Sequence, residues 1–223
     1  MKKNIKIDQI NFYKSSRLIG VGFFLLFFFV INNFYTQESI LNTLKNRLST
    51  EPSLIVKADF KHSFISNQLI AMRGIKAGLN FNDSIKIGIG YSWMKNNFIF
   101  DNPNAVINNE NYNLKYSYVS LFFDYSVYSY SNWNYILSSD FAIAKFAYKN
   151  RLTRKVDFSS FGFVLEPSLA AEYRLFKYVI AGGGIGYRFV LRDKNNITES
   201  FSAPLYILRV KLDFLSIYND HFK

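Results

Sequence analysis

The feature of this sequence that most limits its fold is a repeated two-residue alternation of apolar and polar side chains. In Ser84–Met94, the apolar Ile85, Ile87, Ile89, Tyr91 and Trp93 alternate with Lys86, Gly88, Gly90 and Ser92. Consecutive side chains of a β-strand point to opposite faces, whereas no helix sorts residues with a period of two. The segment therefore predicts a strand with one apolar face and one polar face.

Seven further segments have this alternation or form apolar runs of similar length. They are Leu54–Phe64, Ile70–Phe81, Val119–Val127, Tyr135–Tyr148, Phe161–Leu175, Val179–Leu191 and Tyr206–Phe214. Each is long enough to cross a membrane as a tilted strand. Within Phe161–Leu175, Pro167 lacks the N–H that a strand ladder uses, and this predicts a β-bulge there.

The connections between these segments alternate in length. Asn82–Ser84, Ser129–Asn134 and Leu175–Lys177 are short, whereas Asn96–Asn111, Lys149–Phe158 and Arg192–Ser202 are longer and rich in Asn, Asp and Lys. Outer-membrane barrels have short turns at the periplasmic end and long loops outside. Aromatic residues make up 19% of the chain, more than a compact soluble domain readily buries, and a lipid-facing surface accommodates them.

These observations predict an all-β fold: one eight-stranded antiparallel up-and-down transmembrane β-barrel. Lipid offers no hydrogen-bond partner to an exposed sheet edge, so the sheet must close. Eight strands leave a lumen that side chains fill, and we expect inward residues of both charge signs to pair there as a structural network. The main members are Lys86, Glu166, Glu172, Arg174, Arg188, Arg209, Lys211 and Asp213.

Gly182, Gly184 and Gly186 leave room beside these charged side chains. Because no Walker lysine follows them, these glycines do not indicate a phosphate-binding loop.

The N-terminus has the composition of a signal peptide. Five Lys or Arg residues in Met1–Arg17 precede the apolar run Leu18–Ile31. As a helix these 14 residues would span about 21 Å, less than the roughly 30 Å hydrocarbon core, which favours cleavage over anchoring. We predict a cleavable signal peptide at 1–36, a short periplasmic lead-in at 37–52, the barrel at 53–218 and a C-terminal tail at 219–223.

The eight segments, the signal peptide and aromatic flanks such as Tyr91 with Trp93, and Tyr187 with Phe189, resemble the small OmpA/OmpX-like outer-membrane barrels of the porin-like superfamily. The resemblance covers roughly residues 53–218. It implies location in the outer membrane of a Gram-negative bacterium and recognition by the barrel-insertion machinery. That class typically ends on an aromatic residue; here Phe214 or Tyr218 would serve, followed by Asn219–Lys223.

Little in the sequence points to catalysis or metal binding. The chain has no Cys and only two His, which excludes disulfides and thiolate metal sites. His62 and Ser63 are consecutive in a predicted strand, so they face opposite sides and are poorly placed as a base and its nucleophile. We predict no catalytic residue, no metal site and no cofactor. His221 is expected to be a surface residue of the tail.

The predicted function is a non-enzymatic barrel with a structural, ligand-presenting or narrow-passage role in the cell envelope. The alternatives are a lipid A-modifying hydrolase, using serine with His62 and an acid such as Glu166, and an accessory barrel of a secretion or assembly complex. Removal of residues 1–36 lowers the formal net charge from +11 to +7. The remaining basicity favours outer-membrane lipid and lipopolysaccharide as partners. Without a face of Arg and base-stacking aromatics, nucleic acid is not expected.

Overall fold

The computed structural model describes residues 48–49, 51–65, 68–95, 98–100, 112–150, 153–192 and 200–213. They belong to one compact unit, Arg47–Lys223. The predicted signal peptide, most of the lead-in and the tail lie outside the described residues, as do Phe214, Tyr218 and His221, so these assignments stay predictions. Among the residues described, no helix is both long and apolar enough to span a membrane.

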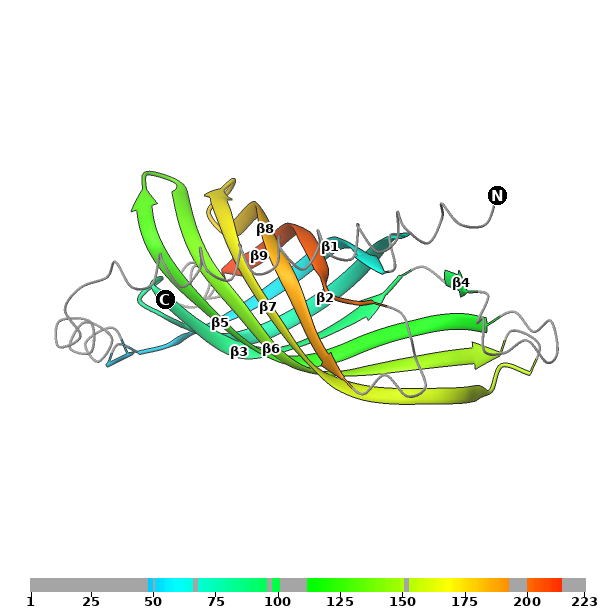
Figure 1. The fold of residues 1–223 in the computed structure, drawn as a ribbon. Helices are drawn as coiled ribbons and strands as arrows, with labels where there is room; N and C mark the ends of the chain where they lie inside the picture. The colour runs from blue at the N-terminus through cyan, green and yellow to red at the C-terminus, as the bar shows by residue number, and fades with distance from the viewer. Residues whose placement is uncertain are drawn as a thin grey trace. The chain divides into compact units, whose positions relative to one another are not determined.

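The strands form a closed antiparallel sheet (Figure 1). They are β1 (Ser53–Ile65), β2 (Gln68–Phe81), β3 (Ile85–Met94), β4 (Phe98–Phe100), β5 (Tyr112–Tyr130), β6 (Trp133–Asn150), β7 (Val156–Arg174), β8 (Val179–Arg192) and β9 (Ala203–Asp213). Sequence neighbours pair along the sheet except β3 and β4; β1 pairs with β9, and β3 pairs with β5. The three-residue β4 pairs with β5 beyond the end of β3, so it adds no position to the ring. The predicted eight-stranded closed barrel is confirmed.

The strands are staggered around the barrel. From Leu137, the residues that lie in register on β7, β8 and β9 lead to His62 on β1. In the other direction, the residues in register on β5, β3 and β2 lead from Leu137 to Phe81. Phe81 lies one residue beyond Asn80, which is the partner of Ser53 at the start of β1. The two paths therefore reach β1 at positions about ten residues apart. A stagger of this size is expected for a closed barrel of eight strands that are tilted by roughly 40°.

The two faces of the sheet have the opposite arrangement to that of a soluble protein. Inward side chains include Lys57 and Asp59, both fully buried, whereas the outward Ile89, Phe163 and Leu208 are 66%, 68% and 61% exposed. Large apolar side chains rarely cover a whole surface in contact with water. An outward apolar face around a charged interior is the arrangement of a barrel in lipid.

Three strands are longer than predicted. Strand β5 begins at Tyr112 and not near Val119, β6 continues to Asn150, and β7 begins at Val156. Both ends of the predicted connection Lys149–Phe158 are therefore strand. The polar residues of this region suggested a loop, but Tyr112–Tyr118 pair residue by residue with Ala144–Asn150 and extend the sheet. Figure 1 shows β5, β6 and β7 reaching beyond the ends of their neighbours.

The predicted bulge at Pro167 is wrong. Pro167 pairs in register with Ser139 of β6, and on the β8 side the pairs Leu165–Phe189 and Ser168–Gly186 have the same offset. The ladder to β8 is interrupted between these pairs without a change of register. A missing N–H removes a hydrogen bond but inserts no residue, so the strand continues straight. Register shifts occur instead between Ser126 and Tyr128 and between Tyr148 and Lys149.

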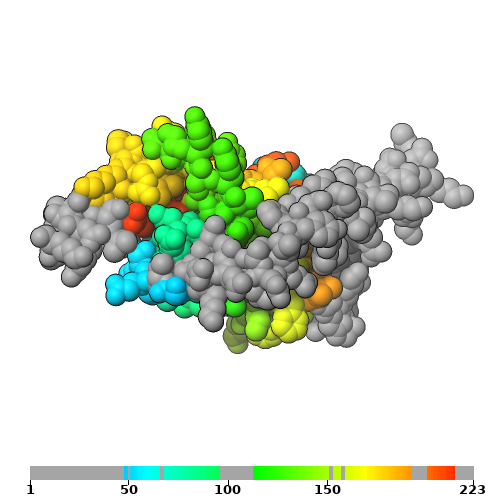
Figure 2. Space-filling view, turned by 90° about the vertical axis from the view of Figure 1, so that its left-hand side faces the viewer, coloured from blue at the N-terminus to red at the C-terminus, as the bar shows by residue number. Residues whose placement is uncertain are grey.

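The end of the barrel that carries the short turns is called the turn end, and the opposite one the loop end. At the turn end, Asn82 and Asp83 both adopt positive φ angles, 50° and 54°, as the tight hairpin turn with right-handed strand twist requires. The Ser84 amide donates to the Phe81 carbonyl at 3.0 Å. Figure 2 faces this end, where the green turn of β5 and β6 and the yellow turn of β7 and β8 lie.

Two glycines allow β2 and β3 to approach closely on the lumenal side. Gly78 pairs with Gly88. A Cβ atom on Gly88 would lie 2.2 Å from the Ala77 carbonyl oxygen and 2.5 Å from the Cα of Gly78. Both contacts are with backbone, which a rotamer change cannot relieve. The outward Gly183 differs, because its Cβ would meet nothing closer than 3.7 Å.

We therefore expect Gly88→Ala to lower the free energy of unfolding by about 2 kcal/mol through overpacking. The matched substitution Gly183→Ala should change it by less than about 0.5 kcal/mol. Urea titration of the two variants in lipid vesicles, followed by heat-modifiable gel migration, measures the difference. Equal stability of the two variants would show that the backbone at Gly88 shifts freely.

Candidate functional site: the lumen and its two ends

Oppositely charged side chains cross the lumen as a continuous chain of ion pairs, called here the charge ladder. Its members alternate in sign in the order Lys211, Glu172, Arg209, Asp59, Lys76, Asp140, Lys61, Glu166 and Arg188, with Asp124 and Lys57 as a branch from Arg209. Every member is at most 3% exposed. Because the side chains come from β1, β2, β5, β6, β7, β8 and β9, the ladder joins opposite walls of the barrel.

The central contacts are short enough for charge-assisted hydrogen bonds. Arg209 Nε lies 2.8 Å from Asp59, and Lys76 Nζ bridges Asp59 at 3.0 Å and Asp140 at 2.7 Å. Lys61 Nζ bridges Asp140 at 2.8 Å and Glu166 at 2.5 Å. Each shared ion therefore has partners on both sides, which offsets the cost of removing it from water.

The eight residues singled out from the sequence occupy three kinds of position. Glu166, Glu172, Arg188, Arg209 and Lys211 are members of the charge ladder. Lys86 is buried near the turn end, where its Nζ donates to the Asp83 carbonyl at 3.2 Å. Arg174 and Asp213 form a separate pair at 3.2 Å, with side chains 37% and 14% exposed.

The loop-end half of the lumen is apolar, which the sequence interpretation missed. Tyr116 stacks on Phe146 with ring centroids 5.0 Å apart, and Phe201 meets the two rings at 5.3 Å and 4.5 Å. The buried cluster around them, called here the aromatic plug, comprises Ile65, Ile70, Met72, Met94, Leu114, Tyr116, Tyr118, Ala142, Ala144, Phe146, Tyr148, Val164 and Phe201. The signal was present in the sequence, because Leu114, Tyr116 and Tyr118 have the same parity as the inward Asp124.

Arg188 joins the ladder to the plug. Its Nε donates to Glu166 at 2.6 Å, its Nη2 contacts Met72 Sδ at 3.0 Å, and its guanidinium carbon lies 5.1 Å from the centre of the Tyr116 ring. The Tyr118 hydroxyl donates to Glu166 at 2.8 Å. The Arg188 guanidinium over the Tyr116 ring and the Tyr118 hydroxyl bound to Glu166 thus join the charged layer to the apolar layer. Arg188 keeps the Glu166 carboxylate as its counter-charge.

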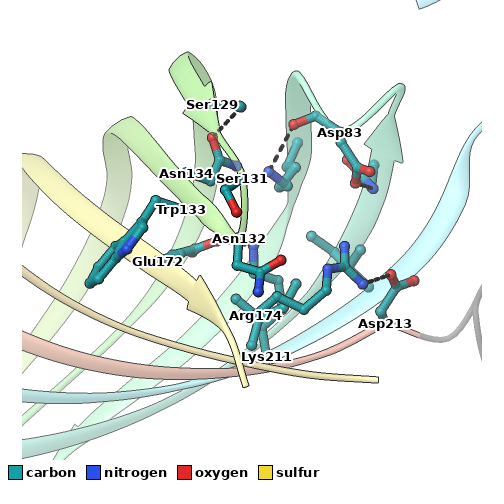
Figure 3. Close-up of a pocket in the computed structure, with 14 residues that line it drawn as sticks. Asp83, Ser129, Ser131, Asn132, Trp133, Asn134, Glu172, Arg174, Lys211 and Asp213 are labelled. Atoms are coloured by element: carbon teal, nitrogen blue, oxygen red, sulfur yellow. Dashed lines mark hydrogen bonds and ion pairs between the residues drawn. The ribbon is translucent and has the colours of Figure 1, made fainter. Parts of the chain in front are cut away.

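The turn end opens into a small polar recess (Figure 3). Its volume is about 210 Å³, and its rim includes Asp83, Asn132, Arg174 and Asp213, with Glu172 and Lys211 of the charge ladder also lining it. The figure shows Trp133 directed away from the other labelled side chains. Its ring packs instead against Tyr173, with centroids 4.9 Å apart. The recess is smaller than the roughly 300 Å³ at which drug-sized ligand pockets begin, and it suits water.

The described residues offer little to catalysis. No three His, Asp or Glu side chains among them group as metal ligands. The lumenal carboxylates of the ladder are each engaged by a cation. His62 is exposed on the outward face, whereas Ser63 is fully buried and donates to the Pro204 carbonyl at 2.8 Å. The two side chains of the hydrolase alternative thus lie on opposite faces of β1.

Comparisons with known proteins identify the fold. No protein-family model and no curated protein matches the chain. The crystal structure of Neisserial surface protein A superposes with a TM-score of 0.59 at 16% identity, over 74% of this chain and 100% of that one. This is the fold of the small OmpA/OmpX-like outer-membrane barrels. The outer-membrane localisation predicted from the sequence agrees with it.

Other small outer-membrane barrels match more distantly. The N-terminal barrel of Pseudomonas aeruginosa OprF has a TM-score of 0.45 at 12% identity, over 74% of this chain and all of that one. A major outer membrane protein of Thermus thermophilus has 0.49 at 12% identity, over 72% of this chain and 99% of that one.

In this barrel, Glu166→Gln should lower the free energy of unfolding by about 3 kcal/mol, because Arg188 and Lys61 then lose a buried carboxylate. Arg174→Gln breaks the partly exposed pair with Asp213 and should cost less than about 1 kcal/mol. Urea unfolding in vesicles compares the two. A smaller loss for Glu166→Gln than for Arg174→Gln would mean that the ladder contributes little to stability.

Proposed function

We propose that this chain is a non-conducting outer-membrane barrel that acts as a membrane-embedded scaffold and presents its loop end to partners outside the cell. The observation that carries the proposal is the filled lumen. The charge ladder crosses its middle, and the aromatic plug occupies its loop-end half.

A narrow-passage role is disfavoured by the energetics of the ladder. A solute could cross only if several buried ion pairs separated, and removing one partner of such a pair costs about 3–5 kcal/mol. The recess at the turn end leads to Glu172 and Lys211, which are paired with each other. Beyond the ladder, the stacked rings of Tyr116 and Phe146 and the edge-on ring of Phe201 block the lumen.

The presenting role is supported by the extension of β5, β6 and β7 at the loop end. Tyr112 pairs with Asn150, and Val156 pairs with Lys149, so the connection between β6 and β7 lies on a three-stranded base. Leu114 and Tyr148 are buried on the inner face of this base. Binding loops held by a rigid scaffold lose less entropy when a partner binds.

The proposal includes no enzymatic role. A lipid A-modifying hydrolase needs a nucleophile and a base within hydrogen-bond reach. Ser63 and His62 face opposite sides of β1, and Glu166 is held by Lys61 and Arg188 deep in the lumen. No specific observation favours a second function.

Planar-bilayer recording tests whether the lumen conducts. Folded protein, verified by its heat-modifiable migration, should give no current steps above the baseline, while a wide porin inserted into the same bilayers gives the expected openings. Reproducible steps from the folded protein would refute the non-conducting proposal.

Single-cysteine labelling tests the orientation, because the chain contains no native cysteine to interfere. Lys155→Cys, exposed between β6 and β7, should react with a membrane-impermeant maleimide on intact cells. Asn132→Cys, in the turn between β5 and β6, should react only after the outer membrane is permeabilised. The reverse pattern would show that the turn end faces outward.

A further inference from the structure

Among the strand residues whose side chains the structure describes, the charged side chains on the outward face are all cationic and all lie toward the loop end. They are Arg73, Lys115, Lys145 and Lys149, and the exposed Lys95 follows directly after β3. No carboxylate lies on the outward face among the strand side chains that the structure describes. We call Arg73, Lys95 and Lys145 the cationic belt.

The belt spans four adjacent strands of the ring, β2, β3, β5 and β6. Arg73 of β2 pairs with Trp93 of β3, Trp93 pairs with Ser117 of β5, and Ser117 pairs with Lys145 of β6. Three strand spacings put the Cα atoms of Arg73 and Lys145 about 14 Å apart. Long side chains of this kind extend along an apolar surface and bring their charges toward the headgroup region.

The belt has a local excess of positive charge. In the described part of the chain, Arg73, Lys95 and Lys145 form no ion pair with a carboxylate. Lys145 Nζ lies 6.0 Å from the centre of the Phe161 ring. Like charges on neighbouring strands destabilise a sheet unless an anion lies between them. The geometry therefore calls for an external anion.

The position of the belt indicates where that anion lies. Tyr91 and Trp93 stack beside Arg73 with centroids 5.7 Å apart, and such rings favour the membrane–water interface. The corresponding outward surface at the turn end carries the exposed Tyr130, Trp133 and Tyr135 without a charge among them. The outward strand surface thus carries cations near the loop-end interface and uncharged aromatic rings near the turn-end interface.

We propose that the cationic belt binds the phosphate groups of the glycolipid in the outer leaflet, the lipid A type of headgroup. The inference rests on the proposed orientation with the loop end outward. A headgroup that carries two phosphates on a sugar backbone supplies the charge that the belt lacks, and its acyl chains lie along the exposed Ile143 and Val119 below. The belt is then a lipid site on the outer wall of the barrel, separate from the lumen.

The two tryptophans provide a test with a built-in control, since Trp93 lies within the belt and Trp133 at the turn end. Full-length Trp133→Phe protein, folded in neutral detergent with EDTA, is titrated with diphosphoryl lipid A, with the same lipid stripped of both phosphates, and with phosphatidylglycerol. Trp93 emission reports binding. The Trp93→Phe protein, which keeps only Trp133, should respond weakly.

We expect saturable binding of diphosphoryl lipid A that is roughly tenfold tighter than binding of the stripped lipid or of phosphatidylglycerol, a difference of about 1.4 kcal/mol. Arg73→Gln with Lys145→Gln should abolish this preference. The control pair Lys155→Gln with Lys177→Gln removes the same charge outside the belt and should leave affinity within about twofold, as exposed charges contribute little singly.

Equal affinity for diphosphoryl and stripped lipid, or an unaltered preference in the Arg73→Gln, Lys145→Gln protein, would overturn the proposal. Equal binding of phosphatidylglycerol would overturn the assignment to the glycolipid. Both variants are first checked for heat-modifiable migration, so a loss of folding is recognised. The measurement is made in detergent and does not depend on conductance, so its failure is distinguishable from failure of the scaffold proposal.

Discussion

The charge ladder is the interaction on which the rest of this barrel depends. A sheet that closes in lipid must place one face inward, and eight strands leave an interior too narrow for bulk water. Charges in that interior are tolerable only when each has a partner. The ladder meets this requirement by sharing: Lys61, Lys76 and Arg209 each contact more than one carboxylate. Because these contacts link strands far apart around the ring, they also fix the shape of the lumen.

The fold could be predicted from the sequence because the two faces of each strand meet different solvents. The alternation in a segment such as Ser84–Met94 has a period of two whatever strand lies beside it. The positions and the number of the strands could therefore be predicted from each segment by itself. The inward position of Glu166, Arg188 and Arg209 followed from parity in the same way. Their partners did not, because pairing across the lumen depends on the stagger of the strands, which no single segment contains.

The aromatic plug could not be separated from the lipid-facing surface by composition alone. Tyr116 and Phe146 are the residue types that also cover the outside of the barrel, and only their parity assigns them inward. Near the plug, the sequence pattern predicts a strand only from Val119 and a connection at Lys149–Phe158, among the connections rich in Asn, Asp and Lys. The prediction from the preferences of single residues is wrong there. Backbone pairing between Tyr112–Tyr118 and Ala144–Asn150, together with packing of the plug, outweighs those preferences.

The inside and the outside of the wall resolve the same electrostatic problem in different ways. Within the lumen no solvent or lipid reaches Lys61 or Lys76, so the counter-charge has to come from the chain itself. On the outer wall, Arg73 and Lys145 face a medium that changes from hydrocarbon to headgroups within a few ångströms, and the counter-charge can be external. Outward cations, which the described strand side chains place only toward the loop end, favour the orientation that brings them to the more anionic leaflet of a membrane. The outward Trp133 and Tyr135 at the turn end are uncharged, so they do not oppose this preferred orientation.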